Sequence, residues 1–279
     1  MKKLASIVLL LGLTAMVFIG SGVQVAAEES GSKSNKVLNI AHRGASGYAP
    51  ENTMAAFEQA FEMKADMFEL DVQMSKDGEL VVIHDTKVDR TTDGAGKVKD
   101  LTYDELQELD AGSWFSEKFE GEKIPKLGEV LDEYRGKIAI LIEIKSPSLY
   151  PGIEQKVADA LEARNMDKPN NNKIIVQSFN HESVKNFHSI LPGVPVGVLV
   201  GYSENGISDR QLENFAAYAQ YVNPNKAMID SELVDRIHAY GLETHPYTVR
   251  DRVAAQYLLN AGVDGIITDY PDYVDPHKQ

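Results

Sequence analysis

Residues 68–85 read FELDVQMSKDGELVVIHD, and they predict a strand, a tight turn and a returning strand. The first half alternates polar and apolar residues, which is the period of a strand with two different faces. Asp77-Gly78 is a strong signal for a two-residue hairpin turn. That turn places Asp71 opposite His84, and Glu69 shares the face of Asp71. Two carboxylates and an imidazole therefore converge on one face of the hairpin, unless that face is a solvated polar edge.

Apolar runs and amphipathic stretches alternate along the chain on both sides of this hairpin. The runs typical of strands are residues 37–41, 67–73, 138–144, 173–179, 194–200, 220–223, 242–249 and 264–268. The stretches typical of helices are residues 53–63, 127–134, 151–163, 181–190, 208–219, 231–240 and 251–260. Strands that alternate with helices form parallel sheets, and eight such units predict a closed (β/α)8 TIM barrel. An open, doubly wound sheet is the alternative.

We expect residues 37–279 to form one TIM-barrel domain. The strand that follows Asp77-Gly78 is predicted to be an extra hairpin arm, because a two-residue turn cannot connect parallel neighbours. Residues 86–126 then form a small inserted segment between this arm and the next helix.

The N-terminus resembles a secretory signal peptide. Lys2 and Lys3 precede a mostly apolar run, and the small residues 25–27 stand before Glu28. This pattern predicts a signal peptide over residues 1–27 and a secreted, extracellular protein, with an uncleaved anchor as the alternative. Residues 28–36 read as a linker. The chain has no cysteine, so we expect neither a disulfide nor a lipid-modified cysteine.

The formal net charge is −14, and removal of the two N-terminal lysines would make it more negative. Phosphate backbones need clustered Lys and Arg, so this charge argues against a nucleic-acid partner. An anionic small molecule could still bind where a cation and a few basic residues reverse the local sign. Once the signal is cleaved, we expect no stable insertion in a membrane.

Polar side chains stand where several predicted strands end. They are His42 and Arg43 after the first strand, Glu69 and Asp71 on the second, Glu143 and Lys145 on the third, and Gln177 on the fourth. Active sites of TIM barrels lie at the carboxyl ends of the strands. Glu143 and Lys145 close an apolar run and are unusual core residues, although they could simply form a buried ion pair.

Glu69, Asp71 and Glu143 offer three carboxylates from neighbouring strands. Ligation by oxygen alone suits a hard divalent cation, Ca2+ or Mg2+, better than zinc. His42 and His84 remain free to act as general base and general acid. Together with the basic residues at the same strand ends, this set suits phosphate-ester chemistry, in which positive groups stabilise the developing charge.

Other hydrolase classes fit these residues less well. A glycosidase could use Glu69 and Glu143 as acid and base, but both histidines would then have no role. A serine hydrolase has no support, because residues 201–205 depart from the motif G-x-S-x-G at the fifth position. His245 lies within a predicted strand, and we expect it to be a packed core histidine.

The order and spacing of several short motifs resemble the glycerophosphodiester phosphodiesterase family, secreted bacterial type, from about Val37 to Pro271. The motifs are Ala41-His42-Arg43-Gly44, Pro50-Glu51-Asn52-Thr53, Glu69-Leu70-Asp71-Val72, His84-Asp85, Asp110–Phe115, Glu143-Ile144-Lys145, Gln177-Ser178-Phe179, Tyr247-Thr248-Val249 and Thr268-Asp269-Tyr270-Pro271. Each motif is weak alone, but the set is specific.

The resemblance implies a TIM barrel that hydrolyses glycerophosphodiesters to sn-glycerol 3-phosphate and an alcohol. It assigns His42 and His84 as the acid–base pair, and Glu69, Asp71 and Glu143 as ligands of a divalent cation, with Ca2+ favoured over Mg2+. It places Arg43 and Lys145 on the phosphate and Gln177, Phe179 and Tyr247 around the substrate. In the implied mechanism the glycerol 2-hydroxyl attacks phosphorus, and water opens the resulting cyclic phosphate.

Two residues depart from the family pattern. Many relatives have Trp in place of Tyr247 and Asn in place of Arg250. Arg250 adds positive charge near the mouth and could favour a polymeric substrate such as wall teichoic acid over deacylated phospholipids. Two alternatives remain, an extracellular phosphoglycerol-binding protein and a related barrel enzyme such as a sphingomyelinase D or a phosphoinositide phospholipase C.

Overall fold

The computed structural model describes residues 36–168 and 174–274. The predicted signal peptide at 1–27 and the linker up to residue 35 lie outside the described residues. Within the described ranges, no helix combines the length and the apolar character that crossing a membrane requires.

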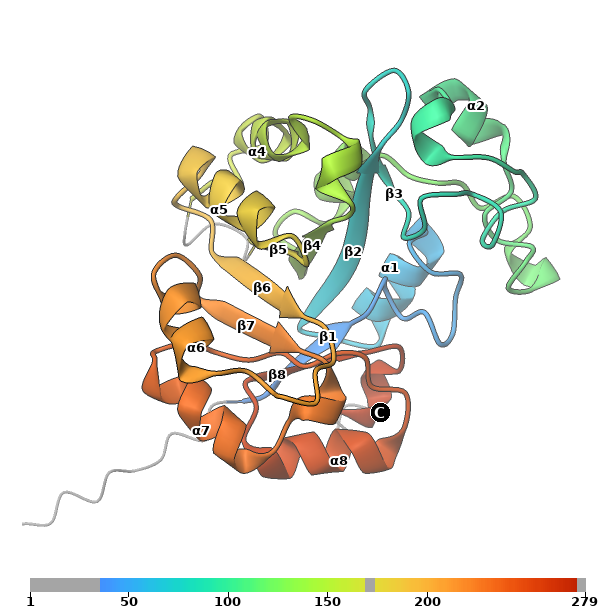
Figure 1. Cartoon of the computed structure of the whole chain (residues 1–279). Coiled ribbons are helices and arrows are strands. Elements are labelled where there is room, and N and C mark those ends of the chain that lie inside the picture. The colour runs from blue at the N-terminus through green and yellow to red at the C-terminus, as the bar shows by residue number, and fades with distance from the viewer. Residues whose placement is uncertain (1–35, 169–173, 275–279) are drawn as a thin grey trace, which may run out of the picture. The chain divides into compact units, whose positions relative to one another are not determined.

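The described strands form one sheet in which seven strands are parallel neighbours in the order β7-β6-β5-β4-β2-β1-β8 (Figure 1). The bounds are β1 Leu38–Ala41, β2 Met67–Met74, β4 Ala139–Ile144, β5 Ile174–Ser178, β6 Val196–Val200, β7 Tyr221–Pro224 and β8 Gly265–Thr268. The antiparallel arm β3, Leu80–Val82, pairs with β2, and Val81 also makes a single antiparallel bridge to Lys126. A helix follows most parallel strands, as the alternation predicted.

The predicted strand 242–249 is present only as an irregular segment, but it closes the barrel. Glu243 makes a parallel bridge to Tyr221 of β7, and Tyr247 makes one to Asn225, which directly follows β7. Val249 makes a parallel bridge to Thr268 of β8. Pro246 has no N–H and cannot donate to a neighbouring strand, which helps to keep the ladder discontinuous. The expectation of a regular eighth strand is therefore wrong in detail, whereas the (β/α)8 TIM-barrel fold is confirmed.

The predicted helices are all found, with ends shifted by a few residues. They are α1 Met54–Glu62, α3 Leu127–Tyr134, α4 Ile153–Glu162, α5 His181–Ile190, α6 Asp209–Ala216, α7 Ser231–Ala239 and α8 Arg252–Ala261. Side chains of Thr53, Asn180, Ser208, Asp230 and Asp251 cap five of them by accepting a hydrogen bond from a first-turn N–H. Such caps satisfy N–H groups that have no partner within the helix.

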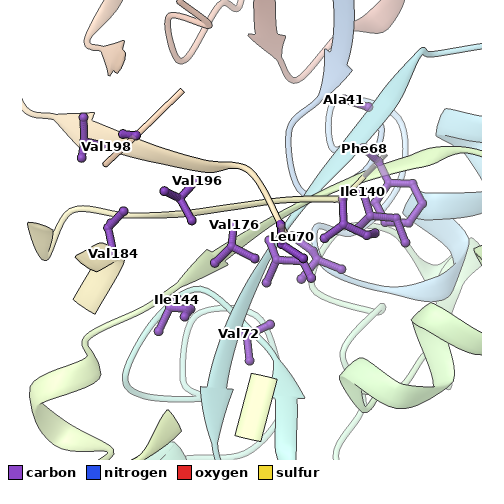
Figure 2. Close-up of a cluster of buried hydrophobic side chains, with 14 of the residues drawn as sticks. Ala41, Phe68, Leu70, Val72, Ile140, Ile144, Val176, Val184, Val196 and Val198 are labelled. Atoms are coloured by element: carbon purple, nitrogen blue, oxygen red, sulfur yellow. The ribbon is translucent and has the colours of Figure 1, made fainter. Parts of the chain in front are cut away.

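Alternate residues of the strands face two different layers. Phe68 and Leu70 of β2 point outward into the main apolar core beneath the helices, where Figure 2 shows them near Ile140 and Val176. Met67 of β2 belongs to a second cluster, with Ile40, Leu141, Ile175 and Ile267 from other strands. Because side chains alternate along a strand, Glu69 and Asp71 fall on the same side as Met67. The period of two thus places these carboxylates inside the barrel.

The register of the β2–β3 hairpin differs by one residue from the prediction. Val72 pairs with Val82 and Met74 with Leu80, so Asp71 lies opposite Ile83 rather than His84. The loop has three residues, 76–78, and Gly78 adopts a left-handed conformation with φ of 87°. Three-residue loops that end in a left-handed residue are a common alternative to two-residue turns.

The segment between β3 and α3 contains the short helix α2, Tyr103–Glu108, and 3-10 turns at Val98–Asp100 and Glu117–Phe119. It has its own apolar cluster, which includes Val88, Leu106 and Ile124 together with Val81 of β3. Figure 1 shows α2 near the hairpin arm. The hairpin arm therefore packs against this segment through Val81, while the chain that leaves the arm turns back to the barrel.

Candidate active site

Three acidic side chains meet at the carboxyl ends of β2 and β4. Asp71 and Glu143 are register partners on these neighbouring strands, and Glu69 precedes Asp71 by two residues. One carboxylate oxygen from each lies within 4.8 Å of the others, and all three residues are buried. The strand period and the parallel register together produce this acidic cluster.

The cluster has the chemistry of a cation site. The Oδ1 atom of Asp71 is buried and has no hydrogen-bond partner. Burial, followed by repulsion from Asp71, raises the pKa of Glu143 to about 7 and the pKa of Glu69 well above its ordinary value. A divalent ion would give the Asp71 oxygen a partner, and its positive charge would offset the repulsion among the three carboxylates. The three residues therefore fit a divalent cation.

Arg43 and Asn52 support the cluster from the loop after β1. The Arg43 backbone N–H donates to Glu69 Oε2 at 2.8 Å, and its Nε lies 3.2 Å from Asp71 Oδ2. The Asn52 side chain donates to the same Asp71 oxygen at 2.8 Å. Although burial opposes it, the positive charge of Arg43 and then of Lys145 lowers the pKa of Asp71. Asp71 is thus ionised while its two acidic neighbours resist ionisation.

His42 is held by an acidic residue from the other end of the chain. Its Nδ1 lies 2.6 Å from Asp269 Oδ1, and Asp269 also accepts from Arg250 Nε at 2.5 Å. Burial and the charge of Arg43 lower the pKa of His42, while Asp269 opposes this shift. Although burial acts against it, the hydrogen bond from His42 lowers the pKa of Asp269 to about 2. The result is a neutral imidazole with an ionised partner.

His84, which follows β3, is also held by an acidic residue. Its Nδ1 lies 2.6 Å from Asp85 Oδ1, and burial lowers its pKa. Arg90 donates to Asp85 and also to both carboxylate oxygens of Glu51, which in turn accepts from Arg43 at 2.7 Å. One chain of ion pairs thus connects the inserted segment, the second histidine and the acidic cluster.

A cavity of about 140 Å3 lies in front of these groups. Its lining contains nine of the ten predicted site residues, namely His42, Arg43, Glu69, His84, Glu143, Lys145, Gln177, Phe179 and Tyr247. Asp71, the tenth, is buried behind them. The structure therefore brings the whole predicted set together.

The predicted substrate residues differ in how they are held. Lys145 Nζ lies 2.8 Å from Glu143 and 3.8 Å from Asp71, so this lysine already faces the cluster. Gln177 accepts from Asn223 at 2.8 Å. Phe179 and Tyr247 form an edge-to-face pair with centroids 5.6 Å apart, and the Tyr247 hydroxyl donates to the Val200 carbonyl. The two aromatic rings form an apolar wall beside charged groups.

The site also contains five residues to which the sequence assigns no role there: Glu51, Asn52, Asp85, Arg90 and Asp269. Asp269 directly follows β8, so the rule that selected the other strand ends would have selected it as well. The contacts of Arg90 depend on the path of the inserted segment, for which the sequence carries no signal. His245 is fully buried, as expected for a core histidine.

Comparison with known proteins identifies the family. The model of the glycerophosphoryl diester phosphodiesterase family matches residues 42–273. A protein named glycerophosphodiester phosphodiesterase from Bacillus subtilis (strain 168) is 41% identical and covers 97% of this chain and 96% of its own length. The protein of that name from Caldanaerobacter subterraneus is 44% identical, covering 85% and 96%. An Oleispira antarctica phosphodiesterase, solved in complex with its product sn-glycerol-3-phosphate, is 30% identical with a TM-score of 0.76, covering 85% of this chain and 94% of its own. This chain belongs to the glycerophosphoryl diester phosphodiesterase family.

Proposed function

We propose that this protein hydrolyses glycerophosphodiesters to sn-glycerol 3-phosphate and an alcohol. One observation carries the proposal: a cavity of about 140 Å3 joins an acidic cluster, two histidines with carboxylate partners and two basic side chains. Family membership supports it, as does the product bound to the Oleispira antarctica relative. A binding protein would not need two histidines at one cavity, each held by a carboxylate.

In this proposal Glu69, Asp71 and Glu143 hold a divalent cation. Mg2+ usually rests on one or two carboxylates and demands a near-ideal octahedron, whereas Ca2+ accepts more carboxylates in a flexible geometry. We therefore favour Ca2+ over Mg2+. When bound, such an ion polarises a phosphoryl oxygen and offsets its charge. Arg43 and Lys145, which already face the cluster, bind the remaining phosphate oxygens.

His42 and His84 transfer the protons. In each, Nδ1 faces an ionised carboxylate and is therefore protonated, which leaves Nε2 as the nitrogen that exchanges protons with the substrate. The general base acts with Nε2 unprotonated, and the general acid acts as the imidazolium with a proton on Nε2. One imidazole takes the proton of the glycerol 2-hydroxyl while the hydroxyl oxygen bonds to phosphorus. The other gives a proton to the alcohol oxygen as its bond to phosphorus breaks. Water then opens the cyclic phosphate with the two roles exchanged. The nucleophile belongs to the substrate itself, which gives it a high effective concentration.

The decisive experiment replaces Glu143 by Gln, which keeps the shape of the side chain but removes a charged ligand. We expect Glu143→Gln to abolish Ca2+-dependent release of glycerol 3-phosphate from glycerophosphoglycerol and to weaken Ca2+ binding in titration calorimetry. Glu133→Gln, on an exposed part of α3, is the matched control. Wild-type activity of Glu143→Gln would remove this residue from the metal site.

We further propose that the protein is exported and acts outside the cell, on wall teichoic acid or on deacylated phospholipids. Arg250, which is largely exposed and pairs with the Asp269 carboxylate that holds His42, adds a positive charge that a polyanionic chain could meet near the site. Mass spectrometry of the exported protein should find Glu28 as its first residue. Release of glycerol phosphate from purified teichoic acid supports the polymer, and activity on small diesters alone rejects it.

A further inference from the structure

Beside the catalytic cavity lies a larger and more open hollow of about 570 Å3. Two segments at the carboxyl edge of the barrel form its walls, residues 145–148 after β4 and residues 178–182, which run from the end of β5 into α5. Glu143, Lys145 and Phe179 line both spaces, so the hollow begins where the catalytic cavity ends. On the basis of the proposed function, we propose that this hollow is the leaving-group subsite and that it prefers an uncharged polyol.

The two volumes suit the two halves of a glycerophosphodiester. The catalytic cavity, of about 140 Å3, is the smaller of the two spaces and suits the compact glycerol phosphate half. The hollow, whose volume is within the usual range for small-molecule sites, then takes the alcohol. Lys145 and Phe179 mark the border between the two halves.

The lining of the hollow offers unused hydroxyl groups. The Ser146 and Ser148 side chains make no hydrogen bond to any other described residue, and both border the hollow. The other polar side chains of the two segments are already occupied: the Ser178 hydroxyl donates to the Ile144 carbonyl, and the Asn180 side chain caps α5. Two free hydroxyls that can donate and accept match the hydroxyls of a polyol.

The charges of the border disfavour a cationic alcohol such as choline. An aromatic ring attracts a quaternary ammonium, and Phe179 is exposed at 47%. However, Lys145 Nζ already lies 5.7 Å from the centre of this ring, so a second cation would be repelled. Glu182, the carboxylate on the far wall, pairs with Lys185 at 2.7 Å and is largely exposed. A neutral polyol avoids this repulsion and still uses the serines.

The test compares three diesters with the same glycerophosphoryl half, in which the alcohol is glycerol, choline or methanol. For the unmodified protein with Ca2+, we expect kcat/KM to be highest for glycerophosphoglycerol. Ser148→Trp places a bulky side chain in the hollow and should lower kcat/KM about tenfold more for glycerophosphoglycerol than for the methyl ester. Ser189→Trp, on the exposed side of α5, is the control for a new surface tryptophan.

Each outcome has one meaning. Equal losses on the glycerol and methyl diesters, or equal or better turnover of the choline diester by the unmodified protein, overturn the subsite while leaving the proposed function intact. If the unmodified protein turns over none of the three diesters, the proposed function fails and the subsite fails with it. The comparison within the unmodified protein also decides the matter should Ser148→Trp not fold.

Discussion

His245 makes the stability of the barrel depend on pH. It lies inside the barrel beside the first residues of β7 and β8. Its ring centroid is 4.8 Å from that of Tyr221, and the ring fills the space that a side chain at Gly265 would need. Neither ring nitrogen has a hydrogen-bond partner, and burial lowers the pKa of His245 to about 4. A protonated imidazole at this position would be a buried charge with no hydrogen-bond partner, and the carboxylate of Asp264 offsets its cost only in part.

The sign and size of the effect follow from the two pKa values. The unfolded chain, with an ordinary pKa of 6.5, binds the proton more tightly than the folded chain, with a pKa of about 4. The free energy of unfolding is therefore unaffected by His245 above pH 6.5, falls as the pH drops below that value, and levels off near pH 4. The full loss is ~3 kcal/mol, of which about 2 kcal/mol is lost by pH 5.

The measurement is urea unfolding between pH 7.5 and pH 5, compared with the variant His245→Phe, which keeps a flat ring but cannot titrate. Glu143, whose pKa is raised, contributes with the opposite sign, so both proteins are measured with Ca2+ and only their difference is interpreted. If His245→Phe loses stability on acidification as much as the unmodified protein does, the reasoning is refuted.

Three further predictions concern the site. Asp269→Asn should lower kcat about 10²- to 10⁴-fold with little change in KM, because Asp269 fixes the tautomer of His42. Asp272→Asn, in the next turn, is the control, and an equal loss of kcat in the two variants would contradict the role of Asp269. Arg90→Ala should lower kcat about tenfold and shift its pH profile, since Arg90 orients the partner of His84; an unchanged profile would limit Arg90 to stability. Ca2+ affinity should weaken as the pH falls through about 7, where Glu143 takes up a proton, and a calorimetric Kd independent of pH would contradict this.

The acidic cluster was predictable because it depends only on local rules. The period of two places Glu69 and Asp71 on one face, and parallel neighbours put Glu143 at the same height. The pair of His42 and Asp269 was not assigned, since 227 residues separate them and no short motif joins them. The irregular path of residues 242–249 did carry a local signal, because Pro246 cannot donate to a ladder and interrupts a run otherwise typical of a strand.

The hairpin shows how a wrong register can accompany a correct site. In the actual register Asp71 faces Ile83, and the strand pairing alone would not aim His84 at the acidic cluster. The buried Gln73 side chain solves this, because its amide donates to the carbonyls of residues 83, 84 and 85 at 2.6–2.9 Å, while Tyr150 donates to its oxygen at 2.7 Å. The chain therefore leaves the ladder at Ile83 and is fastened to β2 by one side chain rather than by strand pairing. The position of His84 is set by Gln73, and the turn at residues 76–78 only returns the chain within its reach.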